Sequence, residues 1–125
     1  MSSIWSKVTE EGGGVHVVYF NDEKIIDDLK IQQIAKELNE AVDKAEKRRM
    51  LINFERVKFM SSAMIGKLIL LGKRCKNEQL QLKLCSITPN IMEVFKIMKL
   101  NKVFEIYDDE AKALKAFEGK GGWFS

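Results

Sequence analysis

The spacing of apolar and polar residues changes several times along this chain, and each change predicts a new element. Residues 4–9 and 15–20 have the composition of strands, and the glycine-rich segment 10–14 between them predicts a turn. These two strands are therefore expected to form a hairpin. From residue 31 to residue 45, apolar side chains recur at spacings of three and four, which predicts an amphipathic helix.

The middle of the chain predicts a buried strand, a helix and a second strand. Residues 50–54 are nearly all apolar, as in an interior strand that is covered on both faces, and residues 57–60 are predicted to continue it. A helix is expected to begin at Ser61 and to run to about residue 76. Residues 80–84 then alternate between apolar and polar, which predicts the next strand.

The last part of the chain repeats this order. Thr88 is predicted to cap a helix whose first residue is Pro89. A short strand at 103–107 follows, and Asp108–Asp109 is expected to cap the final helix. The side chains predicted to face the core from the helix that begins at Pro89 are Ile91, Val94, Phe95 and Met98.

Strands that alternate with helices after an initial hairpin predict an α/β fold. We expect a single domain with a mixed, mostly parallel sheet of about five strands and with about four helices. The domain is predicted to span residues 1–118. The glycine-rich residues 119–125, which include Trp123 and Phe124, are predicted to form a C-terminal tail.

Composition narrows the classes of function. The formal net charge is +3 and the charges of both signs are interspersed, which argues against a nucleic-acid partner. No apolar run is long enough to cross a bilayer, and the first residues lack the pattern of a signal peptide. We therefore expect a cytoplasmic protein without a membrane partner.

The sequence offers little catalytic chemistry. It has one histidine and two distant cysteines, so no recognised metal-ligand spacing is present. His16 is expected to be a strand residue with a satisfied or solvated ring, and Cys75 and Cys85 are expected to be buried thiols. There is no glycine-rich phosphate loop followed by Lys and Ser or Thr. We therefore predict that the protein is not an enzyme and needs no metal or cofactor.

Two adjacent serines stand where the central strand meets its helix. Ser61 and Ser62 suit the start of a helix, because serine is a preferred N-cap residue. A second interpretation is that one of them accepts a phosphate, whose negative charge would meet the unpaired N–H groups of the first helical turn.

The segment around these serines resembles a known family. Residues 57–66, read as VKFMSSAMIG, are similar to the junction of STAS domains of the anti-sigma factor antagonist type, in which a strand meets an Asp-Ser-Ser-Gly-Leu-Gly motif. Residues 84–114 resemble the later part of that family, and Ile26–Asp27 matches an acidic position near its functional corner. The resemblance covers about residues 4–117.

The resemblance implies a bacterial partner-switching regulator of transcription. In such proteins the unphosphorylated form binds an anti-sigma factor, usually a serine kinase of the histidine-kinase-like ATPase fold, and the sigma factor is released. Phosphorylation of a motif serine by that kinase ends the interaction, and a serine phosphatase restores it. The kinase supplies ATP and Mg²⁺, and the antagonist itself needs no cofactor.

This chain departs from the family motif at its centre. Aligned without gaps, Ser61 takes the place of the family's Asp, Ser62 that of the first Ser and Ala63 that of the second, which is the usual phosphate acceptor. We predict phosphorylation at Ser62, with Ser61 as the second candidate. The predicted partner-binding residues are Asp27, Ser61, Ser62, Ala63 and Met64.

Two alternatives remain open from the sequence. Without a phosphate acceptor, the protein would be a non-phosphorylated STAS scaffold subunit of a signalling complex, which the Ala63 substitution favours. Separately, Met64 and Ile65 are predicted to lie in the core, with a protein-binding surface as the alternative.

Overall fold

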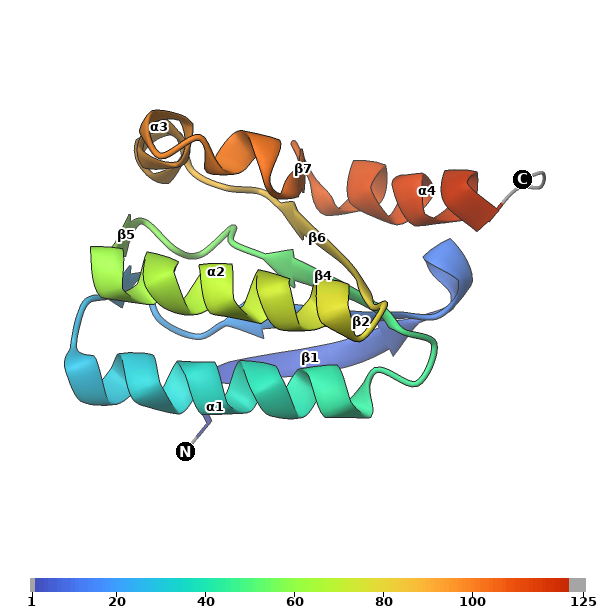
Figure 1. Ribbon diagram of the computed structural model, residues 1–125, viewed down its shortest axis with the longest axis horizontal. Coiled ribbons are helices and arrows are strands. Elements are labelled where there is room, and N and C mark those ends of the chain that lie inside the picture. Colours follow the sequence, from blue (N-terminus) through green and yellow to red (C-terminus); the bar gives the residue numbers. More distant parts are fainter. Residues whose placement is uncertain (1, 122–125) are drawn as a thin grey trace.

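The computed structural model describes residues 2–121 and contains one five-stranded sheet (Figure 1). Only the pair β1–β2 is antiparallel, and the other neighbours in this sheet are parallel. In spatial order the strands are β1 (Ile4–Thr9), β2 (Val15–Phe20), β4 (Arg49–Asn53), β6 (Gln81–Cys85) and β7 (Glu105–Tyr107).

Four α-helices and two 3₁₀-helices lie between or after these strands within the described residues. The α-helices are α1 (Asp28–Lys44), α2 (Ser62–Asn77), α3 (Pro89–Ile97) and α4 (Glu110–Gly121). The short 3₁₀-helices are η1 (Glu11–Gly13) and η2 (Leu100–Lys102). The predicted α/β domain, with a mixed and mostly parallel sheet, is confirmed. No helix of residues 2–121 combines the length and apolar character that crossing a membrane requires.

The helices divide unequally between the two faces of the sheet (Figure 1). We call the side that α1 and α2 cover the broad face, and the side that α4 covers the α4 face. Along β4, Met50 and Ile52 belong to the core of the broad face, whereas Leu51 belongs to the smaller core of the α4 face. This alternation explains why the three central residues of β4, at positions 50–52, are all apolar.

The predicted continuation of the central strand through residues 57–60 is wrong. After β4 the chain turns, with the Val57 N–H donating to the Phe54 carbonyl oxygen at 2.9 Å. The next two residues form β5 (Phe59–Met60), which pairs in parallel with β3 (Lys24–Ile25) in a separate small sheet. The polar pair at positions 55 and 56 therefore marks the end of a strand.

Helix α3 differs from its prediction in two respects. Ile91 and Phe95 are buried as expected, but Val94 is 39% exposed and Met98 is 43% exposed. This helix has nine residues and meets the core along a narrow stripe, so two of the four predicted contacts are wrong. Thr88 stands at the N-cap as predicted, yet its hydroxyl donates to the Val57 carbonyl oxygen at 3.2 Å and makes no cap bond.

The two cysteines lie in the core, and the last helix is longer than predicted. Cys75 and Cys85 are both buried and free, as expected, and burial raises the pKa of each thiol to about 11. Helix α4 extends to Gly121, three residues past the predicted domain boundary at 118. Trp123 and Phe124 lie outside the described residues.

Candidate functional site

The small sheet of β3 and β5 brings two segments together that are distant in sequence. Lys24 pairs with Phe59 and Ile25 with Met60, and the Ser61 N–H donates to the Ile25 carbonyl oxygen at 3.0 Å. The residues that follow each strand therefore leave the sheet at the same end. We call this region the serine corner and define it as Ile26, Asp27, Leu29, Phe59, Ser61 and Ser62.

Ser61 is the N-cap of α2, as its position before an apolar helix predicts. Its backbone is extended, with φ −75° and ψ 162°, and its hydroxyl oxygen accepts from the Met64 N–H at 3.4 Å. The Ser61 carbonyl oxygen accepts from the Ile65 N–H at 3.2 Å. The Ser61 side chain is half-buried, and its hydroxyl oxygen caps the N-terminus of α2.

Ser62 differs from its neighbour in both exposure and bonding. It is the first residue of α2, its side chain is exposed, and its hydroxyl has no hydrogen bond to any residue that the structure describes. Ala63, the next residue, is also exposed. The N–H groups of a first helical turn favour a bound anion, so a phosphate on Ser62 would lie where such a group is stabilised.

Asp27 is the N-cap of the neighbouring helix α1. Its carboxylate accepts from the Lys30 N–H at 3.0 Å, and its carbonyl oxygen accepts from the Ile31 N–H at 2.9 Å. The helices α1 and α2 lie side by side with their N-termini at the same end, next to β5 (Figure 1). Asp27 and the serines therefore share one corner, as expected.

Met64 does not belong to the surface of this corner. Its side chain is 0% exposed and that of Ile65 is 2% exposed, so both are core residues. The prediction of Met64 as a partner-binding residue is corrected by this burial, because a docking partner cannot reach the side chain. The interpretation of both residues as core residues is confirmed.

The exposed apolar side chains of the corner come from other positions. Ile26 is 58% exposed, Leu29 77% and Phe59 50%. Leu29 could have been found from the sequence, because it lies two residues before Ile31 and therefore off the buried stripe of α1. An exposed apolar cluster beside polar caps is typical of a protein-binding surface.

This apolar cluster extends from the corner onto α3. Phe59 and the half-exposed Val94 line the same small hollow of about 130 Å³. The Lys24 ammonium lies 5.6 Å from the centre of the Phe59 ring, and Lys58 pairs with Glu23 at 3.7 Å. The corner thus combines an apolar centre with charged groups of both signs at its edge.

Other sequence candidates lie elsewhere or have structural tasks. In residues 2–121 no group of three or more His, Cys, Asp and Glu side chains is placed to hold a metal ion. Asp109 caps α4 by accepting from the Lys112 N–H at 2.8 Å. His16 is 7% exposed, and within the described part of the chain neither ring nitrogen has a hydrogen-bond partner. The prediction of a satisfied or solvated ring is therefore wrong.

Comparisons of the sequence and of the structure with known proteins both match this chain to STAS domains. Residues 6–113 match the family model of the STAS domain. A Bordetella bronchiseptica protein named "Putative anti-sigma factor antagonist BtrV" is 30% identical over 94 residues, covering 75% of this chain and 80% of that protein. An anti-sigma-factor antagonist (STAS) domain protein from Planctomyces limnophilus has a TM-score of 0.76 at 30% identity, covering 94% of this chain and 98% of that chain.

A third relative shares the fold at lower identity. The Bacillus cell fate determinant SpoIIAA, solved in its phosphorylated form, has a TM-score of 0.63 at 19% identity. The match covers 90% of this chain and 98% of that chain.

Proposed function

The chain belongs to the STAS domain family, with relatives of the anti-sigma factor antagonist type, and from this premise we propose that its serine corner binds an anti-sigma factor. The observation that carries the proposal is Ser62, an exposed serine with a free hydroxyl at a helix N-terminus, beside three exposed apolar side chains. Exposed apolar groups of this kind contribute binding free energy when a partner covers them.

We further propose that the anti-sigma factor is a serine kinase of the histidine-kinase-like ATPase fold. Binding of this kinase would release a sigma factor and so regulate transcription in the cytoplasm. The kinase would supply ATP and Mg²⁺, while this chain acts as a binding protein, without a cofactor and without enzymatic activity. A serine phosphatase would return the phosphorylated chain to its binding form.

Phosphorylation of Ser62 would act on binding through charge and solvation. A phosphate adds a charge of about −1.5 to −2 at neutral pH. The N–H groups of the first turn of α2 stabilise this charge on the free chain. An apolar partner surface that covered the corner would have to remove water from the phosphate, which is costly. The phosphorylated chain should therefore bind the partner more weakly.

The first experiment tests the switch itself. The chain is incubated with an anti-sigma factor kinase of the same organism and ATP, and mass analysis locates the phosphate. We expect one phosphate on Ser62. In calorimetric titrations Ser62→Asp should bind the kinase at least tenfold more weakly than Ser62→Asn, which has a similar size without the charge. Ser6→Asp on the exposed side of β1 is the control and should bind like the unchanged chain.

The second experiment tests the apolar part of the surface. Leu29→Ser should weaken partner binding at least tenfold, because Leu29 is 77% exposed and its removal leaves the core unchanged. Val8→Ser is the matched control, since Val8 is 70% exposed but belongs to β1 and lies outside the corner. Equal losses for Leu29→Ser and Val8→Ser would contradict the assignment of the corner as the docking surface.

A scaffold function without phosphorylation is the second candidate. Ala63 at the usual acceptor position favours it, and so does the engagement of the Ser61 hydroxyl as a helix cap. In that case kinase and ATP would leave the partner complex intact, no phosphate would appear on Ser61 or Ser62, and Ser62→Asp would bind as well as Ser62→Asn.

A further inference from the structure

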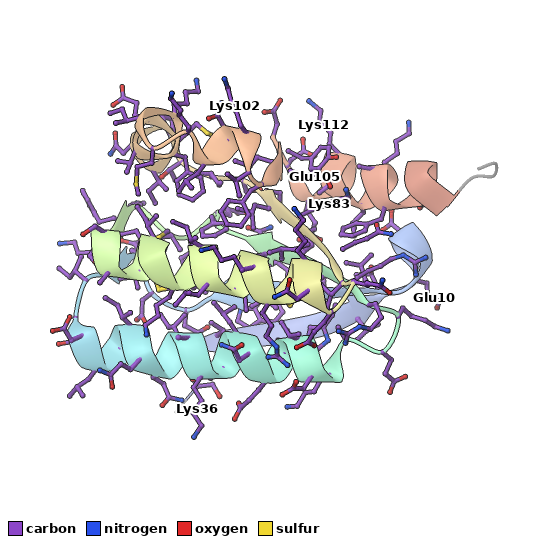
Figure 2. The ribbon with its side chains drawn as sticks, viewed as in Figure 1. Glu10, Lys36, Lys83, Lys102, Glu105 and Lys112 are labelled. Atoms are coloured by element: carbon purple, nitrogen blue, oxygen red, sulfur yellow. The ribbon has the colours of Figure 1, made fainter. Side chains whose placement is uncertain are left out.

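A cavity lies at the opposite end of α1 from the serine corner. It has a volume of about 600 Å³ and lies between the end of β1, the turn before β2 and the chain that follows α1. Figure 2 marks this end of the molecule with Glu10, which belongs to the turn. The volume lies within the range of about 300–1,000 Å³ that is usual for small-molecule sites.

Two side chains in the wall of this cavity carry buried polar atoms without partners. Both ring nitrogens of His16 and the Nε of Arg49 are buried without a hydrogen bond to any residue of the described chain. His16 is 7% exposed. The Nη1 of Arg49 donates to the Gly13 carbonyl oxygen at 2.7 Å, which fixes the guanidinium in the wall. Buried polar groups are nearly always paired, so two in one wall indicate a place for an external hydrogen-bonding group.

His16 lies between two cavities. Its ring also lines a second cavity of about 380 Å³ between β1 and α1, which Glu37 and Glu40 line as well. Burial, together with the nearby charge of Lys44, lowers the pKa of His16. The ring is then neutral at pH 7, with one nitrogen able to donate and the other able to accept.

The charges at the cavity favour a negative ligand. Lys44, Lys47 and Arg49 line it together with the carboxylates of Glu10 and Glu46. Neither Lys44 nor Lys47 has an ion pair with a described residue. The end of α1 does not need them as caps, because the Nη1 of Arg48 donates to the Val42 carbonyl oxygen at 3.3 Å.

Two apolar side chains also line the cavity. Val8 is 70% exposed at this cavity, and Ala45 is buried at its side. An apolar body placed against Val8 would remove this side chain from water, which favours binding. Charged groups and apolar surface thus occur together in one cavity.

We propose that this cavity binds a small organic anion, with its carboxylate or phosphate group near Arg49 and Lys47, a hydrogen bond to His16, and its apolar body against Val8. Arg49 has donors only, and its Nε is a buried donor that the fold leaves unused. This site is independent of the proposed function at the serine corner.

The single histidine makes the proposal directly measurable. The imidazole signals of His16 are followed by NMR at constant pH and ionic strength while phenyl phosphate is added. We expect a saturable shift with phenyl phosphate and none with the neutral benzyl alcohol. Lys44→Gln combined with Lys47→Gln should raise the dissociation constant at least fivefold. Lys36→Gln is the control, because Lys36 on α1 points away from the sheet (Figure 2).

Three results would overturn the proposal. The first is a His16 signal that does not shift with phenyl phosphate, and the second is an equal shift with benzyl alcohol. The third is the same loss of affinity in Lys36→Gln as in the double variant. Because the anti-sigma factor is absent from this experiment, none of these results bears on the serine corner.

Discussion

The two faces of the main sheet differ in how many helices cover them and in which side chains they bury. The broad face is covered by α1 and α2, with α3 at its edge; its core is large and apolar, and the buried His16 lies beside it next to α1. The α4 face has one helix over a small apolar cluster, and next to that cluster the strands carry polar groups. Lys83 of β6 is only 1% exposed there. The α4 face thus combines a small apolar cluster with buried polar side chains that need partners.

The buried side chains of Lys83 and Asn53 on the α4 face both have partners. Lys83 pairs with Glu105 of the neighbouring strand, and its ammonium lies 5.0 Å from the centre of the Phe117 ring. Figure 2 shows Lys83 and Glu105 next to each other at the start of α4. Glu110 accepts from the Tyr19 hydroxyl at 2.6 Å and from the Asn53 amide at 3.1 Å. Buried polar groups need such bonds to be tolerated.

The largest loss of stability is expected when either of two neighbouring core residues of β4 is replaced by alanine. Ile52 faces the broad side and Leu51 faces α4, and both are 0% exposed. Substitution of either by Ala should lower the free energy of unfolding by about 2–5 kcal/mol. We expect about 4 kcal/mol for Ile52→Ala and about 2.5 kcal/mol for Leu51→Ala, because the lone helix α4 can move into the space more easily than the helices of the broad face.

Urea unfolding of the two variants measures this difference, provided that the slope with denaturant stays constant. Val8→Ala is the exposed control and should change the free energy of unfolding by less than about 0.5 kcal/mol. Equal losses for Ile52→Ala and Leu51→Ala would mean that the two faces are equally rigid.

The next effect concerns the ion pair of the α4 face. Glu105→Gln leaves the buried Lys83 ammonium without its charged partner, and we expect a loss of about 2 kcal/mol. This is less than for a fully buried pair, since the Glu105 side chain is 50% exposed and water screens the charge. Lys83→Met should be nearly neutral or stabilising, because it removes the need for a partner.

A double-mutant cycle with both substitutions separates the pair from its surroundings. Lys112→Met is a matched control for removal of an exposed lysine, and it should have little effect. If Lys83→Met destabilises as strongly as Glu105→Gln, the buried charge itself stabilises the α4 face.

Much of this comparison could be predicted from the sequence, because apolar periodicity reports burial directly. The nearly all-apolar residues 50–54 predicted a strand covered on both faces, and the stripe that includes Ile31, Ile34 and Leu38 predicted the buried side of α1. Ser61 and Asp109 were recognisable as helix caps because their side chains suit the unpaired N–H groups at a helix start.

Other features depend on contacts between distant segments, which a local pattern does not contain. The strands β3 and β5 have two residues each, too few for a period, and only their pairing defines the serine corner. Val94 has helical spacing to the core residues but lies at the edge of the contact stripe. The burial of Lys83 and His16 depends on α4 and on α1, respectively, and isolated charged or polar residues in a strand give no sign of it.

Smaller changes in stability are expected from glycine substitutions in α2, which test how tightly this helix packs against Phe104. Both Gly66 and Gly72 belong to α2, where Ala is intrinsically favoured by about 1 kcal/mol. A Cβ at Gly66 would meet no atom within 4 Å, whereas a Cβ at Gly72 would lie 2.8 Å from Cε1 of Phe104. Gly66→Ala should therefore stabilise by about 0.5–1 kcal/mol and Gly72→Ala should destabilise by about 1 kcal/mol.

Thermal unfolding of these two variants gives opposite shifts of the midpoint if this packing is correct. Stabilisation by both substitutions would show that the Phe104 ring moves away without cost. The broad face would then be less rigid at its border than at Ile52.

The smallest changes in the free energy of unfolding are expected from removal of a helix cap on either face. Asp109 caps α4 with an acceptor distance of 2.8 Å, whereas Ser61 caps α2 at 3.4 Å. A carboxylate at a helix N-terminus also interacts with the helix dipole. We expect Asp109→Ala to cost about 1 kcal/mol and Ser61→Ala about 0.5 kcal/mol in urea unfolding. Ser62→Ala is the control for α2 and should change stability least, because the Ser62 hydroxyl bonds to no described residue. If Ser62→Ala costs more than Ser61→Ala, the Ser62 hydroxyl has a structural task and is a poorer candidate for the phosphate.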